Sequence, residues 1–565
     1  MRNIQRGPVL DVRAIGGLHV VILAWDFAAG QSGRQTGLLG FAIERTELRN
    51  GVAAERYFLR GIKRFKNKDQ GLPPGTPVPT SEHPVQTFQW GDYTAKPATT
   101  YRYRVVPVYG APKMLEPDDA SATTVEITTE ADDAAPATGL VRHQIHFNRG
   151  AAGSQAFARR FENVELDEDK PESDAMKWLS RGLFEALLAF IAEAKDSSYG
   201  LRAMLYEFRY RPVGLAFKRA RTAGADIDIR YEAQSYKDEN QDMIAGAQIK
   251  SSCKPQKSRG GIRHNKFIVL LKDNLPIAVW TGSTNISAGG LFGHSNVGHA
   301  VWDEGLAAAY LDYWNRLTAA DVAPALLKTA NNMVEATPGA SDLPPAGRIM
   351  TVFSPRDSKE DVATLGWYAN LLGRGGQRIA CATFAFGLDD VLKNALLQDD
   401  GVLRYAVFDK RPSKEFEDGV SALQNTVIAA GAKLAMGDLE NFRAERLTGF
   451  NRNLYIHDKF LVLDPLRNDP IVITGSANFS PASQYSNDEN MLVIRGDKRV
   501  ADIYFGEFLR VFDHLYSRYI VKILKEKGTQ NPDAGYLKET WQEWAPGHFK
   551  PDSRKDLRRR YFLEE

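Results

Sequence analysis

Two short runs decide the fold of this chain: IHDKFLVLD at residues 456–464 and ITGSAN at residues 473–478. The first contains an apolar run of strand length, and together they predict two strands and a turn. An imidazole, an ammonium group, a small hydroxyl and an amide would then meet at the end of one sheet. A single His-x-Lys pair on a strand is common, however, and would indicate nothing by itself.

The same pattern occurs a second time, as HNKFIVL at residues 264–270 and TGSTN at residues 281–285. The shared chemical positions lie 193 residues apart: His264 and His457, Lys266 and Lys459, Gly282 and Gly475, Asn285 and Asn478. A repeat that stays in register over so many polar positions is hard to obtain by chance. It indicates two similar halves that each contribute one set of reactive side chains.

These residues resemble the signature of the phospholipase D superfamily, His-x-Lys-x4-Asp followed downstream by Gly-Ser-x-Asn, which occurs once in each half of a two-lobed enzyme. The second copy matches throughout, including Asp464 and Ser476. The first copy departs from the signature, because Leu271 stands where the acid should be. That acid is therefore missing or displaced to Asp273. The resemblance covers residues 140–525 and implies a phosphodiesterase.

Length and composition describe a folded protein of several domains. At 565 residues the chain exceeds one ordinary domain, so we expect two or three. Hydrophobic residues make up 43% and charged residues 25%, values typical of a soluble globular protein. A net charge of +2 gives no global basic field of the kind that marks a dedicated nucleic-acid binder.

Cysteine usage and apolar runs bear on the compartment. Cys253 and Cys381 lack metal-ligand spacing, so packed thiols in a reducing, cytoplasmic setting are expected. The apolar run at residues 18–25 could be mistaken for a secretory signal. His19 and Trp25 suit a signal poorly, and the run is better interpreted as a strand. No window approaches the roughly 20 apolar residues that a membrane span needs.

Residues 1–132 predict an immunoglobulin-like or fibronectin type III-like β-sandwich. Apolar runs alternate with Gly and Pro turns, and Asn50-Gly51 suits a hairpin turn. The segment at residues 96–105 resembles a fibronectin type III corner, with Trp25 as the core tryptophan of the other sheet. Such modules act as spacers or as docking surfaces for a protein partner. The basic run at residues 63–68 is either a solvated loop or a phosphate binder.

Two α/β runs follow, and each ends in its His-x-Lys strand. We expect lobe 1 at residues 140–345 and lobe 2 at 346–525, each with a mostly parallel or mixed sheet between helices, in a pseudo-twofold bilobal unit. The tail, residues 526–565, should pack on the body, with phosphate binding by its arginines as the alternative. The expected helices span 174–194, 213–223, 359–372, 388–397 and 500–523, and the expected strands 201–208, 226–231, 378–386 and 402–408.

The duplicated side chains can supply what phosphodiester cleavage requires: a nucleophile, a proton donor and fixed positive charge. One neutral imidazole would attack phosphorus while the other, protonated, gives its proton to the leaving oxygen and later deprotonates water. The two lysines and two asparagines would stabilise the transition state, so no metal or other cofactor is expected. Ser283 and Ser476 would shape the turns and support substrate binding.

The resemblance also implies roles for single residues. It makes His264 the nucleophile and His457 the acid and base, although the reverse stays open. Glu489, in the run NDEN, would fix one imidazole by hydrogen bonding. Together with Asp464 it would favour a protonated His457. The corresponding position of the first half is Asn296, so the halves are not equivalent, and a partly degraded site is the alternative.

Two substrate classes share this chemistry. The two-lobed form and an apolar loop at residues 289–292 favour a phospholipid, which leads by a small margin. The basic segment 250–263, with Lys257 and Arg263 as substrate-binding candidates, favours a nucleic acid, but it would also meet an anionic membrane. An inactive phosphate-binding or scaffold protein is the third interpretation. Four further histidines that lie close in sequence to lobe elements, His143, His146, His294 and His299, form no metal-ligand pattern and are expected to be structural or to support the site.

Overall fold

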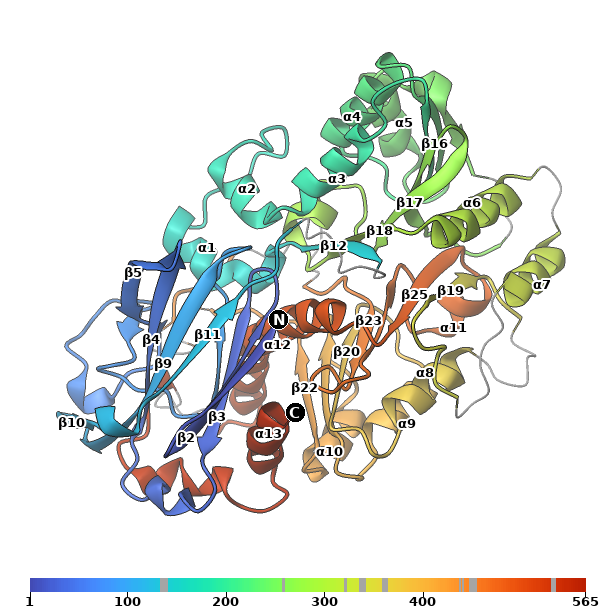
Figure 1. The fold of residues 1–565 in the computed structure, drawn as a ribbon. Coiled ribbons are helices and arrows are strands. Elements are labelled where there is room, and N and C mark those ends of the chain that lie inside the picture. Colours follow the sequence, from blue (N-terminus) through green and yellow to red (C-terminus); the bar gives the residue numbers. More distant parts are fainter. Residues whose placement is uncertain are drawn as a thin grey trace.

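The computed structural model describes residues 1–132, 141–256, 260–319, 323–334, 342–357, 364–435, 438, 442–446, 455–529 and 535–564. An N-terminal β-rich region packs beside two α/β lobes (Figure 1). The first lobe follows the sandwich in the chain, and the second lobe contains the later motif. Neither the fibronectin type III topology nor a twofold relation of the lobes is established, and both stay predictions.

The N-terminal region consists of two main sheets around a shared core. Trp25 and Tyr103 are fully buried between them. Asn50 and Gly51 have φ values of 51° and 77°, as a two-residue hairpin turn requires, so the predicted hairpin is confirmed. One sheet has the order β1 (Arg2–Arg6), β2 (Leu10–Gly16), β3 (Val21–Phe27) and β8 (Gln89–Asp92). The other has the order β10 (Met114–Pro117), β9 (Thr100–Ala111), β4 (Gly40–Arg49) and β5 (Val52–Phe58), with β11 (Thr123–Thr128) beside β9. A small separate sheet pairs β6 (Arg60–Gly61) with β7 (Val78–Pro79).

Within the described residues, each lobe has one mixed sheet, and the two sheets have the same strand order. The first four pairings are antiparallel and the last two are parallel in both. Sheet 1 runs β12 (Arg142–Phe147), β18 (Val297–Trp302), β17 (Leu275–Gly282), β16 (Lys266–Lys272), β13 (Tyr199–Leu205), β14 (Asp226–Tyr231), β15 (Cys253–Pro255). Sheet 2 runs β19 (Ile349–Ser354), β25 (Glu489–Arg495), β24 (Ile471–Gly475), β23 (Phe460–Leu463), β20 (Ile379–Phe384), β21 (Leu403–Phe408), β22 (Thr426–Ala430).

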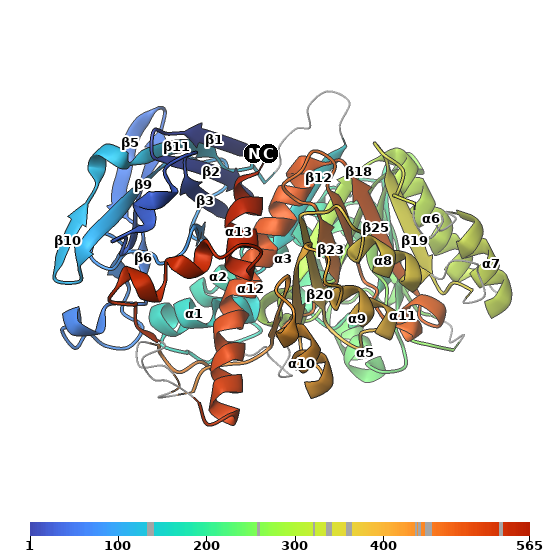
Figure 2. The ribbon, with the colours of Figure 1, turned by 90° about the horizontal axis from the view of Figure 1, so that it is seen from below.

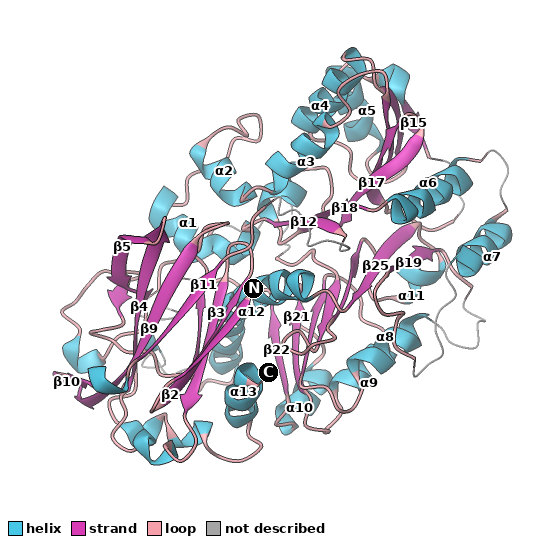
Figure 3. Ribbon diagram, in the orientation of Figure 1, coloured by secondary structure: helices cyan, strands magenta, loops and turns pink. Residues whose placement is uncertain are grey.

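Helices pack against both sheets (Figure 3). The single helix expected at residues 174–194 is wrong, because Arg181 and Gly182 are left-handed, with φ values of 51° and 93°, and divide it in two. No described helix has the length and apolarity to cross a membrane. Lobe 1 contains α1 (Ser154–Phe161), α2 (Asp174–Ser180), α3 (Leu183–Ala192), α4 (Arg211–Thr222), α5 (Lys237–Gly246), α6 (Glu304–Thr318) and α7 (Pro324–Val334). Lobe 2 contains α8 (Thr364–Leu372), α9 (Asp390–Leu396), α10 (Lys414–Ala422), α11 (Pro481–Tyr485) and α12 (Lys498–Glu526).

Helix α12 and the C-terminal tail join the sandwich to the lobes. Figure 2 shows α12 and α13 (Arg554–Leu563) between the N-terminal sheets and sheet 2. Trp544 enters the sandwich core, and its Nε1 donates to the carbonyl of Leu38 at 3.0 Å. Arg559 pairs with Asp26 of the sandwich. These tail residues therefore serve packing within the chain.

Candidate active site

The two motif histidines lie just before the central strands of their sheets, and each is anchored by backbone of the opposite lobe. His264 N–H donates to the carbonyl of Asp488 at 3.1 Å, beside a parallel bridge between Arg263 and Asp488. His457 N–H donates to the carbonyl of Ser295 at 3.0 Å. Each of these hydrogen bonds joins the end of a strand in one lobe to backbone of the other lobe. The contact between the lobes therefore brings the two imidazoles together.

The two rings face one buried site. Their centroids are 6.5 Å apart, close enough for both to contact one phosphate group. His264 is 7% exposed and His457 only 3%. Such burial excludes most water, which strengthens every electrostatic interaction in the site.

Each imidazole uses Nδ1 to bind the other lobe. His264 Nδ1 donates to Glu489 Oε2 at 2.8 Å. His457 Nδ1 donates to the carbonyl of Ser283 and to Asn296 Oδ1, both at 3.0 Å. Since all these partners are acceptors, the proton of each neutral ring lies on Nδ1. The Nε2 atoms are therefore left for a substrate.

This pairing corrects one sequence-based prediction. Glu489 was expected to support His457, yet it contacts His264. The chain positions 296 and 489 are equivalent in the two halves, and each supports the histidine of the other half. The argument that a carboxylate keeps His457 protonated is therefore wrong, because the partner of His457 is the neutral amide of Asn296.

The motif serines fix these partners. Ser476 Oγ donates to Glu489 Oε2 at 2.7 Å, and Ser283 Oγ donates to Asn296 Oδ1 at 2.8 Å. Both serines are fully buried. Their hydroxyls thus have partners inside the protein, which matches the predicted supporting role and not their assignment as substrate-binding residues.

Asp464 does not join the site, contrary to expectation. It follows β23 at the end remote from His457, where its Oδ1 accepts the N–H groups of Arg378 at 2.6 Å and Ile379 at 3.3 Å. At roughly 3.3 Å per strand residue, β23 alone holds the two more than about 10 Å apart. Asp273, the alternative acid of the first half, lies in the corresponding turn, and its N–H donates to the carbonyl of Ser198 at 2.7 Å. Both acids belong to turns.

Arg263 and the apolar loop at residues 289–292 do not have the roles that the sequence suggested. Arg263 is 1% exposed and forms a 2.6 Å ion pair with Asp488, so it ties the lobes together and is not available to a substrate. The apolar loop at residues 289–292 is buried, with Leu291 and Phe292 at 0% exposure, because it packs under the first sheet's helices. Lys257 lies outside the described residues. The loop therefore no longer favours a phospholipid over a nucleic acid as the substrate.

The lysines bring two positive charges into this buried site. Lys266 Nζ donates to the carbonyl of His264 and Lys459 Nζ to that of His457, each at 2.5 Å. Burial lowers the pKa of Lys266 to about 8. Burial, reinforced by the charge of Lys266, lowers the pKa of Lys459 well below its usual value. A bound anion would relieve this repulsion.

The motif asparagines follow strands β17 and β24. Asn285 and Asn478 each have a buried Oδ1 with no hydrogen-bond partner among the described residues. Burial lowers the pKa of His264, and Glu489 opposes that effect. Burial lowers the pKa of His457 much further, and Lys459 and Lys266 add to the effect. The two imidazoles are thus electrostatically different.

Comparison with known proteins identifies part of this arrangement. Residues 369–512, which contain His457, Lys459, Asn478 and Glu489, match the family model described as "Cardiolipin synthase, PLD-like domain". The chain contains a phospholipase D-like domain. The matched part belongs to lobe 2, and the histidine set of lobe 1 lies outside it. No curated protein sequence matches the chain.

Comparison with solved structures finds similar chains of low sequence identity. Phosphatidylserine synthase of Haemophilus influenzae is 11% identical, with 62% of this chain and 91% of that chain covered and a TM-score of 0.43. Nuc of Salmonella typhimurium, a phospholipase D family member, is 24% identical over 24% of this chain and 85% of its own, with a TM-score of 0.20. Yeast tyrosyl-DNA phosphodiesterase is 13% identical, with 56% of this chain and 88% of that chain covered and a TM-score of 0.33.

Three aromatic residues contact the histidines of the phospholipase D-like site, and of these the sequence analysis named only His294, without a role in the site. Tyr206 lies over His264 with ring centroids 4.6 Å apart, and its ring is 5.0 Å from the ammonium of Lys266. Phe386 and His294 each lie 6.0 Å from His457. Tyr206 and Phe386 follow strands β13 and β20, which neighbour the motif strands, and that position was the signal available in the sequence.

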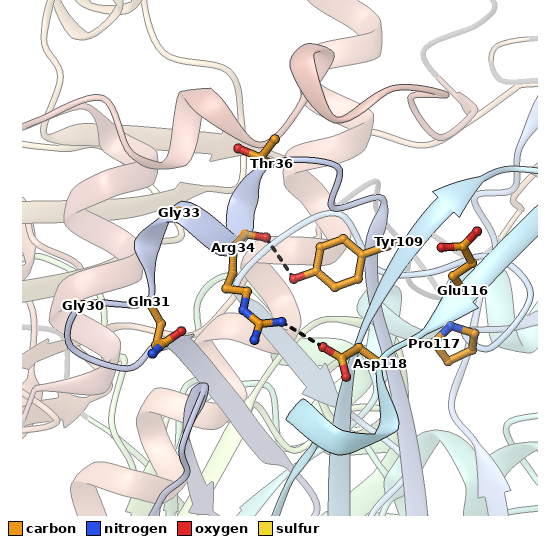
Figure 4. A pocket seen from close by; sticks show the side chains of 9 residues that line it. All are labelled: Gly30, Gln31, Gly33, Arg34, Thr36, Tyr109, Glu116, Pro117 and Asp118. Carbon is orange, nitrogen blue, oxygen red and sulfur yellow. Dashed lines mark hydrogen bonds and ion pairs between the residues drawn. The ribbon is translucent and has the colours of Figure 1, made fainter.

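A hollow of about 730 Å³ lies elsewhere, on the N-terminal sheets (Figure 4). Arg34 and Asp118 form a 3.3 Å ion pair there, and the hydroxyl of Tyr109 donates to the carbonyl of Arg34. Its lining shares no residue with the histidine site. Among the described residues, no group of three or more His, Cys, Asp or Glu side chains could hold a metal.

Proposed function

We propose that this protein is a phosphodiesterase that cleaves its substrate through a phosphohistidine intermediate, with a phospholipid as the leading substrate. The observation that carries this proposal is the buried pair of imidazoles, each held through Nδ1 by the opposite lobe, between two ammonium groups. Burial of both ammonium groups is costly even with Glu489 acting on each of them, and a bound phosphodiester would supply further negative charge.

The first step forms a bond between His264 Nε2 and phosphorus while the bond to the leaving oxygen breaks. A proton on His457 Nε2 moves to that oxygen, so the leaving group departs as an alcohol. Lys266, Lys459, Asn285 and Asn478 hydrogen-bond the non-bridging oxygens. One such donor is commonly worth about 2.7–4 kcal/mol.

The second step reverses these roles. His457 takes a proton from water or from an acceptor alcohol, whose oxygen bonds to phosphorus, and the bond to His264 breaks. His457 regains its proton and His264 its lone pair, so the cycle closes without a cofactor. Hydrolysis and transfer differ only in the acceptor.

The assignment of His264 as the nucleophile now depends on Glu489. Phosphorylation of Nε2 gives the ring a positive charge, and the carboxylate on Nδ1 stabilises that charge. His457, held by neutral acceptors, forms a less stable imidazolium and is therefore the stronger acid toward the leaving oxygen.

The description of the family model that matches residues 369–512 names cardiolipin synthase, and this supports a phospholipid substrate. A nuclease remains the alternative, because the site recognises the phosphodiester and not what is attached to it. Contact with an anionic membrane through the basic segment 250–263, and with a protein partner through the sandwich, belong to the same proposal.

One experiment tests both class and mechanism. Purified protein in EDTA is assayed in parallel on anionic phospholipid vesicles, single-stranded DNA and plasmid, with His264→Ala as the matched inactive control. We expect head-group release from vesicles by the wild type alone. Cleavage of DNA instead would replace the lipid proposal by the nuclease, and activity only after a divalent ion is added would contradict the mechanism.

A further inference from the structure

A third histidine lies beside the proposed acid. His294 is 7% exposed, and its ring centroid is 6.0 Å from that of His457. It follows a π-helical turn, η6 (Gly289–Gly293), a feature that frequently occurs at functional sites. Its backbone is fixed, since its N–H donates to the carbonyl of Gly289 at 2.9 Å and its carbonyl accepts from Asn148 Nδ2 at 2.7 Å.

The equivalent position of the other half shows what a structural residue does here. Asn487, 193 residues later, accepts the N–H of Ile262 on its Oδ1 at 2.9 Å and so supports the loop before His264. Before His457, the corresponding N–H of Tyr455 is instead bound by Asp409 Oδ1 at 2.6 Å. The loop therefore does not need a side chain at position 294 for this purpose.

The spacing of the two rings suits a shared ligand atom. His143 and His299, which are joined by a direct 2.8 Å contact between ring nitrogens, have centroids 5.0 Å apart. At 6.0 Å, the rings of His294 and His457 are too far apart for such a bond. The additional separation allows both rings to approach one oxygen atom from two sides.

We propose that His294 is a third catalytic histidine, which donates a hydrogen bond to the leaving oxygen while His457 delivers the proton. This inference rests on the proposed function. The bond from phosphorus to the leaving oxygen breaks, the electron pair stays on that oxygen, and the proton from His457 Nε2 neutralises it. His294 keeps its own proton and only stabilises the developing charge.

The test compares two leaving groups on one phosphodiester. The 4-nitrophenyl ester has a leaving group that departs without much help from an acid. The phenyl ester releases a phenol with a pKa near 10, like that of tyrosine, and therefore needs such help. We expect His294→Asn to slow the phenyl ester about 10²-fold and the nitrophenyl ester less than about threefold. Phe386→Leu is the matched control, because the ring of Phe386 lies as close to His457 as that of His294 but has no N–H or O–H group to donate a hydrogen bond. Its effect should be the same on both esters.

A second variant guards against misfolding of the first. A Cβ at Gly289 would lie 3.2 Å from His294 Cε1 and 3.3 Å from its Nε2, so Gly289→Ala displaces the ring and keeps the histidine. It should show the same leaving-group dependence in weaker form. Equal losses on both esters in both variants would overturn the role of His294 and leave the phosphodiesterase standing. A wild type that cleaves neither ester would refute the proposed function, and this inference with it.

Discussion

The two halves of the candidate active site use equivalent positions differently. His264 is supported by the carboxylate of Glu489, and His457 by the amide of Asn296, although positions 489 and 296 are 193 residues apart like the histidines themselves. One carboxylate in place of one amide makes two chemically identical rings unequal. A duplicated site can thus provide a nucleophile and an acid by changing one residue.

The connection between the lobes differs in the same way. The bridge before His264 contains the buried ion pair of Arg263 with Asp488, whereas the bridge before His457 has Ile456 at the equivalent position. Arg263→Met should destabilise the protein by about 3–5 kcal/mol, because Asp488 would stay charged and buried without its partner. Urea unfolding measures this change. Adding Asp488→Asn should restore most of the loss, and Ile456→Val should cost only about 0.5–1.5 kcal/mol. An unchanged stability in Arg263→Met would contradict the ion pair.

Removing either cation should weaken both halves of the site alike. Lys266→Ala and Lys459→Ala are each expected to lower kcat by about 10²–10³-fold, because each lysine stabilises charge on the transferring phosphoryl group. In the wild type, kcat/KM should fall as the pH rises toward and through about 8, because burial lowers the pKa of Lys266 to about 8 and also lowers the pKa of Lys459 well below its usual value. Near-normal activity in either variant would remove that lysine from the mechanism.

Glu489→Gln makes the halves alike by giving both histidines a neutral partner. We expect kcat to fall on the order of 10²-fold, since the phosphorylated His264 ring loses the carboxylate that stabilises its charge. Circular dichroism controls for the fold. If burst kinetics showed faster formation of the intermediate in this variant, Glu489 would not be supporting the nucleophile.

Asn296→Asp makes the halves alike in the opposite sense. A carboxylate beside His457 stabilises its protonated form and so raises its pKa. The acid form then persists to higher pH, and the alkaline limb of kcat should move upward by about one pH unit. An unchanged pH profile, with the protein folded, would show that position 296 does not act on His457.

The sequence indicated that the two motif histidines would meet, but not which side chain supports each of them. The 193-residue repeat identified His264, Lys266, Asn285 and their partners, because the register of a duplicated motif survives in the chain. It could not reveal that Glu489 crosses to His264, since the distance along the chain places Glu489 beside His457. The same limit explains Arg263, whose charge suggested a substrate until its burial against Asp488 was known.

Fold prediction succeeded and failed for similar local reasons. The Asn50-Gly51 hairpin and α12 follow from turn chemistry and helical spacing, which are properties of neighbouring residues. The break at Arg181-Gly182 was missed because the apolar spacing continues across it. The loop at 289–292 appeared exposed because no local pattern shows that Leu291 and Phe292 pack into the core.

The central claim is that the carboxylate-supported histidine becomes phosphorylated. Mass spectrometry of acid- or base-quenched enzyme, during turnover of an ester with a good leaving group, locates the adduct. We predict phosphorus on His264 in the wild type, accumulation of the same adduct in His457→Ala, and none in His264→Ala. An adduct on His457 of the wild type would reverse the two roles, and the absence of any adduct under every quench would contradict the two-step mechanism.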